Sequence, residues 1–228
     1  MEHLDNQLAK TLASLEQQMR GCATSTPESA ELREPAKITD QRINEAFRGF
    51  ETPHQIASQM LQEARRFVFA MGSGSHPSYW LSLVGSSGTG KTMLSRMITN
   101  VFLRHIEGLR DEHRGTPGDR YSRMGGFMSW PLCVERMLEG DFGFTRQCKE
   151  DWFLVLDDIG AENEKIRELS TSKLFAILNE RQHKFTVLTC NYGLADIAKR
   201  MDPRIASRLL RHGGSVVDST GVKDFNLR

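Results

Sequence analysis

Residues 85–92 read Gly-Ser-Ser-Gly-Thr-Gly-Lys-Thr, a glycine, four residues and then Gly-Lys-Thr, which is the phosphate-cradling pattern. Its glycines let backbone N–H groups face a phosphate, its lysine adds a mobile charge and its last hydroxyl suits Mg²⁺. An apolar strand precedes it and a helical pattern follows it, so an accidental surface turn is the weaker interpretation. We therefore expect nucleotide to contact Gly85, Ser86, Ser87, Gly88, Thr89, Gly90, Lys91, Thr92 and Met93.

Length and charge limit the other possibilities. A chain of 228 residues can hold one sizeable α/β domain and a small appendage. The formal net charge is +1, so the overall charge argues neither for nor against nucleic acid. The four cysteines are scattered without a Cys-x-x-Cys pair, which predicts reduced thiols and no zinc module. Because no segment has the length and apolarity of a membrane span, we expect a cytoplasmic protein without membrane contact.

The N-terminal segment carries a regular apolar pattern, with Leu4, Leu8, Leu12, Leu15 and Met19 three or four positions apart. This spacing predicts an amphipathic helix over residues 3–20. We expect this helix either to dock a partner protein or to pack on its own domain or on a second copy of the chain. A polar tract with two prolines over residues 24–35 reads as a linker, so we expect a helical extension over 1–35 and a main domain over 36–228.

The rest of the chain alternates strand and helix signals. Strands are expected at 80–84, 126–130, 152–156, 185–190 and, more weakly, 215–217. A helix is expected from the Thr52-Pro53 cap signal to Met71, and residues 104–126 read as a long polar loop, more consistent with solvated surface than with a DNA contact. This order predicts an α/β fold with a mostly parallel five-stranded sheet between helices.

Two further strands end in polar residues that suit nucleotide chemistry. Asp157 and Asp158 follow an apolar strand, at the edge where parallel sheets bind ligands. We expect Asp157 and Thr92 to hold Mg²⁺, and Asp158 to orient or deprotonate the attacking water. Asn191 ends the next strand, where an amide suits the γ-phosphate but is also a common turn residue.

Arg204 and Arg208 lie four residues apart, hence on one face of a predicted helix. Two guanidiniums there could reach a phosphate in a neighbouring subunit. The alternative is an ordinary solvated surface with local ion pairs.

Taken together, these landmarks resemble the DnaC/IstB family within the AAA+ ATPases, from Phe47 to the end of the chain. The resemblance rests on the phosphate loop, Asp157-Asp158-Ile159-Gly160 with nearby Glu162, Asn191 and the Arg204–Arg208 pair. It is supported by Phe47, Phe50, Arg181, Thr189-Cys190 and residues 224–228. It implies that Asn191 is the sensor of the γ-phosphate and that Arg208, with Arg204 beside it, is an arginine finger. The short chain after Arg208 leaves no room for a helical C-terminal lid, and Arg228 could supply a late charge instead.

The resemblance further implies an ATPase that uses ATP and Mg²⁺ and self-associates into a helical or ring-like oligomer. We expect it to load the hexameric replicative helicase onto single-stranded DNA, gripping the helicase through the N-terminal helix. An IstB-like transposition ATPase acting on duplex DNA shares the same motifs. A small-molecule P-loop kinase and a nucleotide switch with negligible hydrolysis are the alternatives from other classes.

Overall fold

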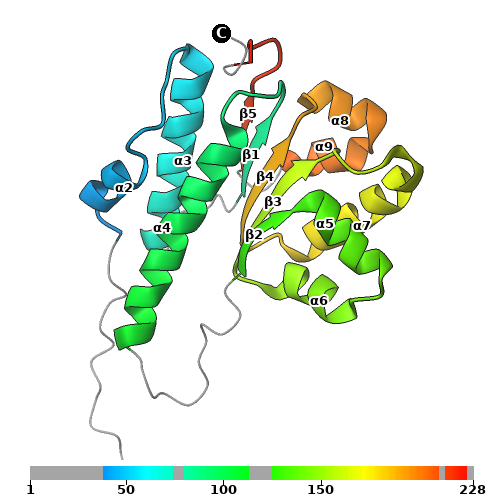
Figure 1. Ribbon diagram of the computed structural model, residues 1–228, viewed down its shortest axis with the longest axis horizontal. Coiled ribbons are helices and arrows are strands. Elements are labelled where there is room, and N and C mark those ends of the chain that lie inside the picture. Colours follow the sequence, from blue (N-terminus) through cyan, green and yellow to red (C-terminus); the bar gives the residue numbers. More distant parts are fainter. Residues whose placement is uncertain (1–37, 74–79, 113–124, 211–213, 225–228) are drawn as a thin grey trace, which may run out of the picture. The chain divides into compact units, whose positions relative to one another are not determined.

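A five-stranded parallel sheet forms the centre of the domain (Figure 1). The computed structural model describes residues 38–73, 80–112, 125–210 and 214–224, so the expected N-terminal helix and linker lie outside the described residues. The strand order is β2-β3-β4-β1-β5, and every neighbouring pair is parallel. The strands are β1 (Trp80–Val84), β2 (Gly125–Ser129), β3 (Phe153–Ile159), β4 (Phe185–Cys190) and β5 (Ser215–Asp218). The expected parallel α/β sheet is confirmed.

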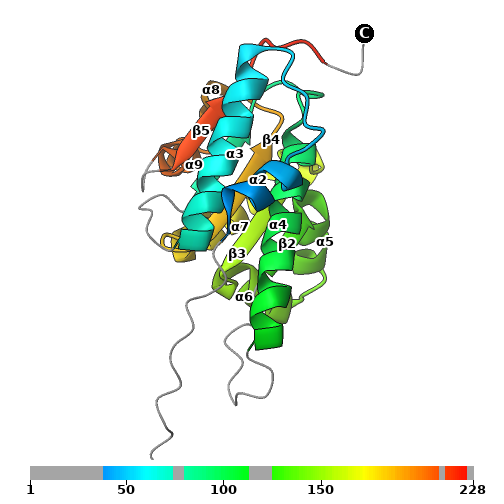
Figure 2. The same cartoon turned by 90° about the vertical axis from the view of Figure 1, so that its left-hand side faces the viewer.

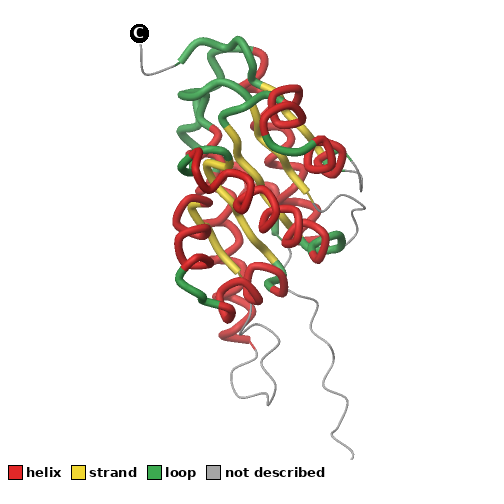
Figure 3. The backbone as a smooth tube through the Cα atoms, turned by 90° about the vertical axis from the view of Figure 1, so that its right-hand side faces the viewer, coloured by secondary structure: helices red, strands yellow, loops and turns green. Residues whose placement is uncertain are grey.

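Helices cover both faces of this sheet (Figure 1). One layer consists of α2 (Asp40–Ala46), α3 (Gln55–Ser73) and α4 (Lys91–Glu112), with α3 and α4 side by side in Figure 2. The other layer, in front of the strands in Figure 3, contains the remaining elements. They are α5 (Trp130–Leu138), α6 (Phe142–Glu150), the 3₁₀ turn η1 (Glu164–Ile166), α7 (Arg167–Glu180), α8 (Leu194–Arg200) and α9 (Pro203–Leu209).

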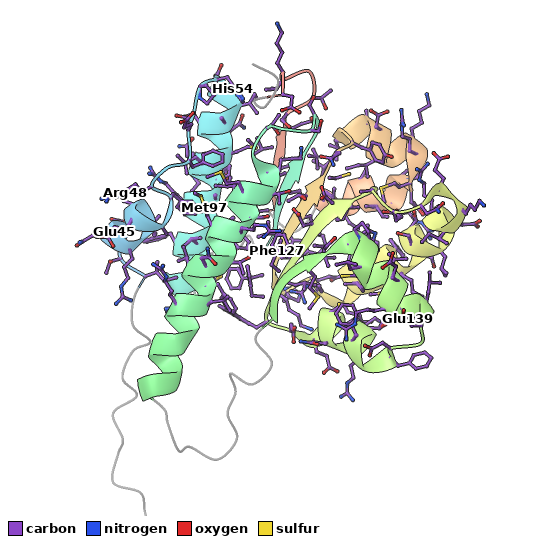
Figure 4. The ribbon with its side chains drawn as sticks, in the orientation of Figure 1. Glu45, Arg48, His54, Met97, Phe127 and Glu139 are labelled. Carbon is purple, nitrogen blue, oxygen red and sulfur yellow. The ribbon has the colours of Figure 1, made fainter. Side chains whose placement is uncertain are left out.

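The alternation of side chains along β3 explains why two layers are needed. Phe153 and Val155 belong to the apolar cluster under α2–α4, whereas Leu154 and Leu156 belong to the cluster under α5–α9. Because both faces are buried, the strand reads as a continuous apolar run, as expected of parallel sheets. Each such side chain contributes about 1.5–3 kcal/mol on burial. Met97 on α4 and Phe127 on β2, both labelled in Figure 4, pack at the margin of the first cluster.

Arg181 is a fully buried cation whose hydrogen bonds join the end of α6 to the start of β4. Its guanidinium donates hydrogen bonds to the carbonyl oxygens of Cys148, Asp151 and Phe185, and to the hydroxyl of Thr186. Burial lowers the pKa of Arg181 to about 10, so the group remains charged at neutral pH. The residue therefore has a structural role away from the phosphate loop.

Some expected boundaries were wrong. Helix α3 begins at Gln55 and not at Pro53, because the Nδ1 atom of His54, at the start of α3 in Figure 4, accepts a hydrogen bond from Ala57 N at 3.0 Å. The polar tract from Arg104 begins as helix, since α4 continues to Glu112; residues 113–124 lie outside the description. Helix α6 was not expected, because only two of its positions, Phe144 and Cys148, are buried apolar residues.

Candidate nucleotide site

The phosphate loop connects the buried strand β1 to the first turn of α4. Positive φ angles at Gly85 (103°) and Gly88 (63°) favour glycine at these turns. Lys91 is 5% exposed, and its ammonium donates to the carbonyl oxygens of Gly85 at 3.1 Å and Ser86 at 2.5 Å. Burial lowers the pKa of Lys91, an effect opposed by neighbours that include Asp158 and Asp157. The loop, the helix N-terminus and this cation together form an anion-binding arrangement.

Asp157 lies behind this loop with its carboxylate held by two hydroxyl groups. Its Oδ1 atom accepts hydrogen bonds from Thr189 Oγ1 at 2.6 Å and from Thr92 Oγ1 at 3.1 Å. Burial raises the pKa of the Asp157 carboxyl, and the charge of Asp158 adds to the effect. Thr92 and Asp157, both expected to hold Mg²⁺, thus offer a hydroxyl and a buried carboxylate on adjacent elements.

Asp158 occupies an unusual backbone conformation at the same edge of the sheet. Its φ angle is 60°, it lies within a register irregularity between β3 and β4, and the strand continues past it to Ile159. The conformation is held by a hydrogen bond from Asp158 N to Thr189 Oγ1 (2.9 Å) and by one from Asn191 Nδ2 to Asp158 Oδ1 (3.2 Å). A strained non-glycine residue needs such surrounding contacts to persist. The two expected residues Asp158 and Asn191 therefore contact each other directly.

A cavity of about 560 Å³ opens at this edge of the sheet. Of the expected nucleotide contacts, residues 87–93 line it, whereas Gly85 and Ser86 do not. The loop between α2 and α3 forms one wall of this cavity, and the sequence did not lead us to expect it there. The lining residues are Gly49, Phe50, Glu51, Ser87, Gly88, Thr89, Gly90, Lys91, Thr92, Met93, Asp158 and Asn191.

The segment after β5 crosses the back of the phosphate loop, which sequence reasoning also missed. Ser219 Oγ donates to Val84 O at 2.9 Å and lies 3.2 Å from Thr89 Oγ1, and Gly221 N donates to Ser86 Oγ at 3.0 Å. A Cβ atom on Gly85 would collide with the backbone of this segment. Residues 219–221 therefore fix the shape of the loop from a position about 130 residues further along the chain.

Glu162 anchors the turn that follows Asp158. The side chain is 5% exposed, and its carboxylate accepts hydrogen bonds from Gly160 N and Ser170 Oγ, both at 2.9 Å. Ser170 Oγ in turn accepts from Trp130 Nε1 at 2.9 Å. Glu162 is one of the residues on which the family resemblance rests, but no role was expected for it. The structure shows that it ties the end of β3 to α7 and α5.

Arg204 and Arg208 lie on α9, as expected, but neither lines the cavity. Both guanidiniums lie over the ring of Phe175 on α7, with Cζ-to-centroid distances of 4.6 Å and 5.2 Å. The structure therefore brings together Lys91, Thr92, Asp157, Asp158 and Asn191, and places the two arginines elsewhere on the same domain.

The residues at the loop fit a magnesium ion. Mg²⁺ prefers oxygen ligands and is usually held by one or two carboxylates together with substrate phosphates. Thr92 Oγ1 and Asp157 Oδ1 are oxygen donors 3.1 Å apart beside the phosphate loop. The buried carboxylate with a raised pKa would be stabilised in its charged form by a neighbouring cation.

None of the helices in the described ranges combines the length and apolarity that crossing a bilayer requires.

Comparisons with known proteins find similarity to solved structures and to no sequence family. No protein-family model and no curated protein matches it. Among solved structures it is similar to AMPPCP-bound DnaA from Aquifex aeolicus, with a TM-score of 0.50 and 20% identity over 74% of this chain and 48% of that one. It is also similar to DnaI, with a TM-score of 0.54 and 21% identity over 78% and 91%. Domain III of DnaA from Thermotoga maritima gives a TM-score of 0.51 and 18% identity over 76% and 65%.

These similarities confirm the expected fold, which the chain shares with DnaI and with part of DnaA, and the expected resemblance to DnaI-like proteins is confirmed at the level of that fold. The chain spans about half the length of the DnaA chain from Aquifex aeolicus.

Proposed function

We propose that the protein binds ATP in the cavity at the carboxyl edge of the sheet and hydrolyses it. The observation that supports this best is the convergence of three strand ends: Lys91 after β1, Asp157 and Asp158 in β3, and Asn191 after β4. The Aquifex aeolicus DnaA structure of the same fold was determined with AMPPCP, an ATP analogue. The phosphates would lie on the loop amides at the N-terminus of α4.

In this proposal Asp158 accepts a proton from the attacking water while the water oxygen bonds to the γ-phosphorus and ADP leaves. The hydrogen bond from Asn191 orients the Asp158 carboxylate toward the cavity that both residues line. Lys91 supplies positive charge to the outer phosphates. Bound Mg²⁺, held by Thr92 and Asp157, would supply neutralisation of the phosphate charge.

We further propose that this ATPase loads the replicative helicase onto single-stranded DNA. Support comes from the DnaC/IstB landmarks in the sequence and from the shared fold with DnaI and with a replication initiator solved with single-stranded DNA. In this proposal ATP binding drives self-association, and Arg208, aided by Arg204, contacts the nucleotide of a neighbouring subunit. Residues 3–20 would grip the helicase.

Capture by a purified hexameric helicase, with a transposase of the IstB-associated type as the comparison, tests this function. We expect helicase capture at micromolar concentration, and a full-length Leu8→Asp/Leu12→Asp variant should lose it while retaining ATP turnover. Capture by the transposase alone would favour the transposition ATPase. Turnover stimulated by a small metabolite, and by neither DNA nor protein, would favour a kinase-like enzyme.

A further inference from the structure

Phe175 is the aromatic residue that the two arginines of α9 share. It lies on α7, is half-buried, and lines a second cavity of about 720 Å³ together with Arg204. Guanidiniums within about 6 Å of a ring centroid are attracted to the π face, and both Arg204 and Arg208 meet this distance. One ring therefore restricts two long side chains that would otherwise have many rotamers.

The two arginines differ in their other contacts. Arg204 donates from Nε and Nη2 to the carboxylate of Asp202, with distances of 2.7–3.1 Å, so its charge is already paired. Arg208 makes no ion pair with any residue in the described ranges, and its Nε atom is buried without a hydrogen-bond partner there. A partly buried guanidinium without an acidic partner is electrostatically suited to an external anion.

We propose that Phe175 is a positioning residue that presents Arg208 to the nucleotide of a neighbouring subunit, while Arg204, paired with Asp202, contacts the same ring. This inference rests on the proposed action of Arg208 in trans. Phe175 does not touch the nucleotide. It limits the rotamers of Arg208, so that less conformational entropy is lost when the guanidinium meets a phosphate.

The effect of the ring can be separated from simple packing by the choice of substitution. Phe175→Leu keeps an apolar side chain but removes the π face, and Phe175→Tyr keeps the face. Two cation–π contacts of about 0.5–1 kcal/mol each correspond to a fall in kcat of about fivefold to thirtyfold for Phe175→Leu. We expect Phe175→Tyr to retain turnover, and Leu169→Ala, an exposed position on the same helix, to serve as the matched control.

Mixing full-length variants gives a measurement that a folding defect would not reproduce. Phe175→Leu protomers keep an intact phosphate loop, so addition of Lys91→Ala protomers with an intact Phe175–Arg208 pair should restore part of the turnover per intact loop. The affinity of the Phe175→Leu protomer, measured alone, for a fluorescent ATP analogue should stay within about twofold of wild type, since a residue outside the nucleotide cavity contributes little to binding.

The outcomes separate this inference from the proposal on which it rests. If Arg208→Ala lowers turnover and Phe175→Leu does not, the arginine finger stands and the role of Phe175 is wrong. If Phe175→Leu lowers turnover but mixing restores none, Phe175 acts within its own subunit and the inference fails. If Arg208→Ala itself leaves turnover unchanged, both the finger and its positioning are overturned.

Discussion

The hydroxyl of Thr189 at the end of β4 bridges the two acidic residues of β3, because it donates to Asp157 Oδ1 at 2.6 Å and accepts from Asp158 N at 2.9 Å. One fully buried hydroxyl thereby fixes both the carboxylate assigned to magnesium and the backbone of the residue assigned to water activation. The bridge crosses from one strand to its neighbour, so the positions of the two carboxylates depend on the pairing of β3 with β4.

Thr189→Val should destabilise the domain and slow hydrolysis. Valine has the shape of threonine but leaves Asp158 N without its partner, a loss of about 1–3 kcal/mol. Thermal unfolding and steady-state ATP turnover measure the two effects. Thr189→Ser, which keeps the hydroxyl, should remain close to wild type in both, and an equal loss in the two variants would contradict the bridging role.

Asp158→Asn should abolish most hydrolysis while preserving nucleotide binding. The amide can still accept the hydrogen bond from Asn191, but it cannot take a proton from water, and general-base catalysis accounts for about 10²–10⁴-fold in rate. Phosphate release under single-turnover conditions, with binding of a labelled ATP analogue alongside, checks this. Unchanged turnover would indicate that the residue does not activate water.

Asp157→Asn should raise the melting temperature at pH 7.5 in the absence of magnesium. Burial raises the pKa of the Asp157 carboxyl in the folded state, so the fold favours its protonated form. The stability from this group is present below its unfolded pKa of about 3.9 and is lost as pH rises through the higher folded value.

The melting temperature should rise by about 2–4 °C for each kcal/mol of unfolding free energy that Asp157→Asn adds. This rise should shrink as the pH is lowered toward 4. Differential scanning calorimetry in EDTA at several pH values measures it. A difference that does not change with pH would show that the ionisation of Asp157 is not its cause.

Glu162→Ala should cost more stability than Glu162→Gln. Alanine leaves Gly160 N and Ser170 Oγ without their acceptor in a buried site, which costs about 1–3 kcal/mol for each unsatisfied group. Glutamine can still accept through its carbonyl oxygen. Chemical denaturation of both variants measures the difference, and equal losses would mean that volume and not hydrogen bonding determines the effect.

Ser219→Ala should weaken nucleotide affinity by about twofold to tenfold, the equivalent of one hydrogen bond of 0.5–1.5 kcal/mol. The variant loses the contacts to Val84 and Thr89 that hold the phosphate loop. Ser215→Ala is the matched control, because Ser215 lies four residues earlier, at the start of β5, and donates to Glu63, a residue outside the nucleotide cavity. Equal effects on affinity in a fluorescence titration would contradict a specific role for Ser219.

Several features could be predicted because they depend on local chemistry. The phosphate loop requires glycine at fixed spacing, and the continuous apolar run at 153–156 is typical of a strand buried on both faces. Strand β4 has the predicted bounds because its β-branched residues favour extended structure. Helix α6 escaped prediction because two buried positions in nine residues give a weak periodic signal, and the start of α3 depends on a His54 cap that is not among the preferred capping residues.

The sequence alone determined that the chain has a phosphate loop, an acidic strand and an asparagine at a further strand end, since each is a short pattern with its own chemistry. Only the tertiary structure decided that Ser219 supports the loop at Thr89, that Thr189 joins Asp157 to Asp158, and that Phe175 lies beneath two arginines. These contacts join residues that are distant along the chain. Their formation depends on strand order and on helix packing over the sheet, which no local pattern specifies.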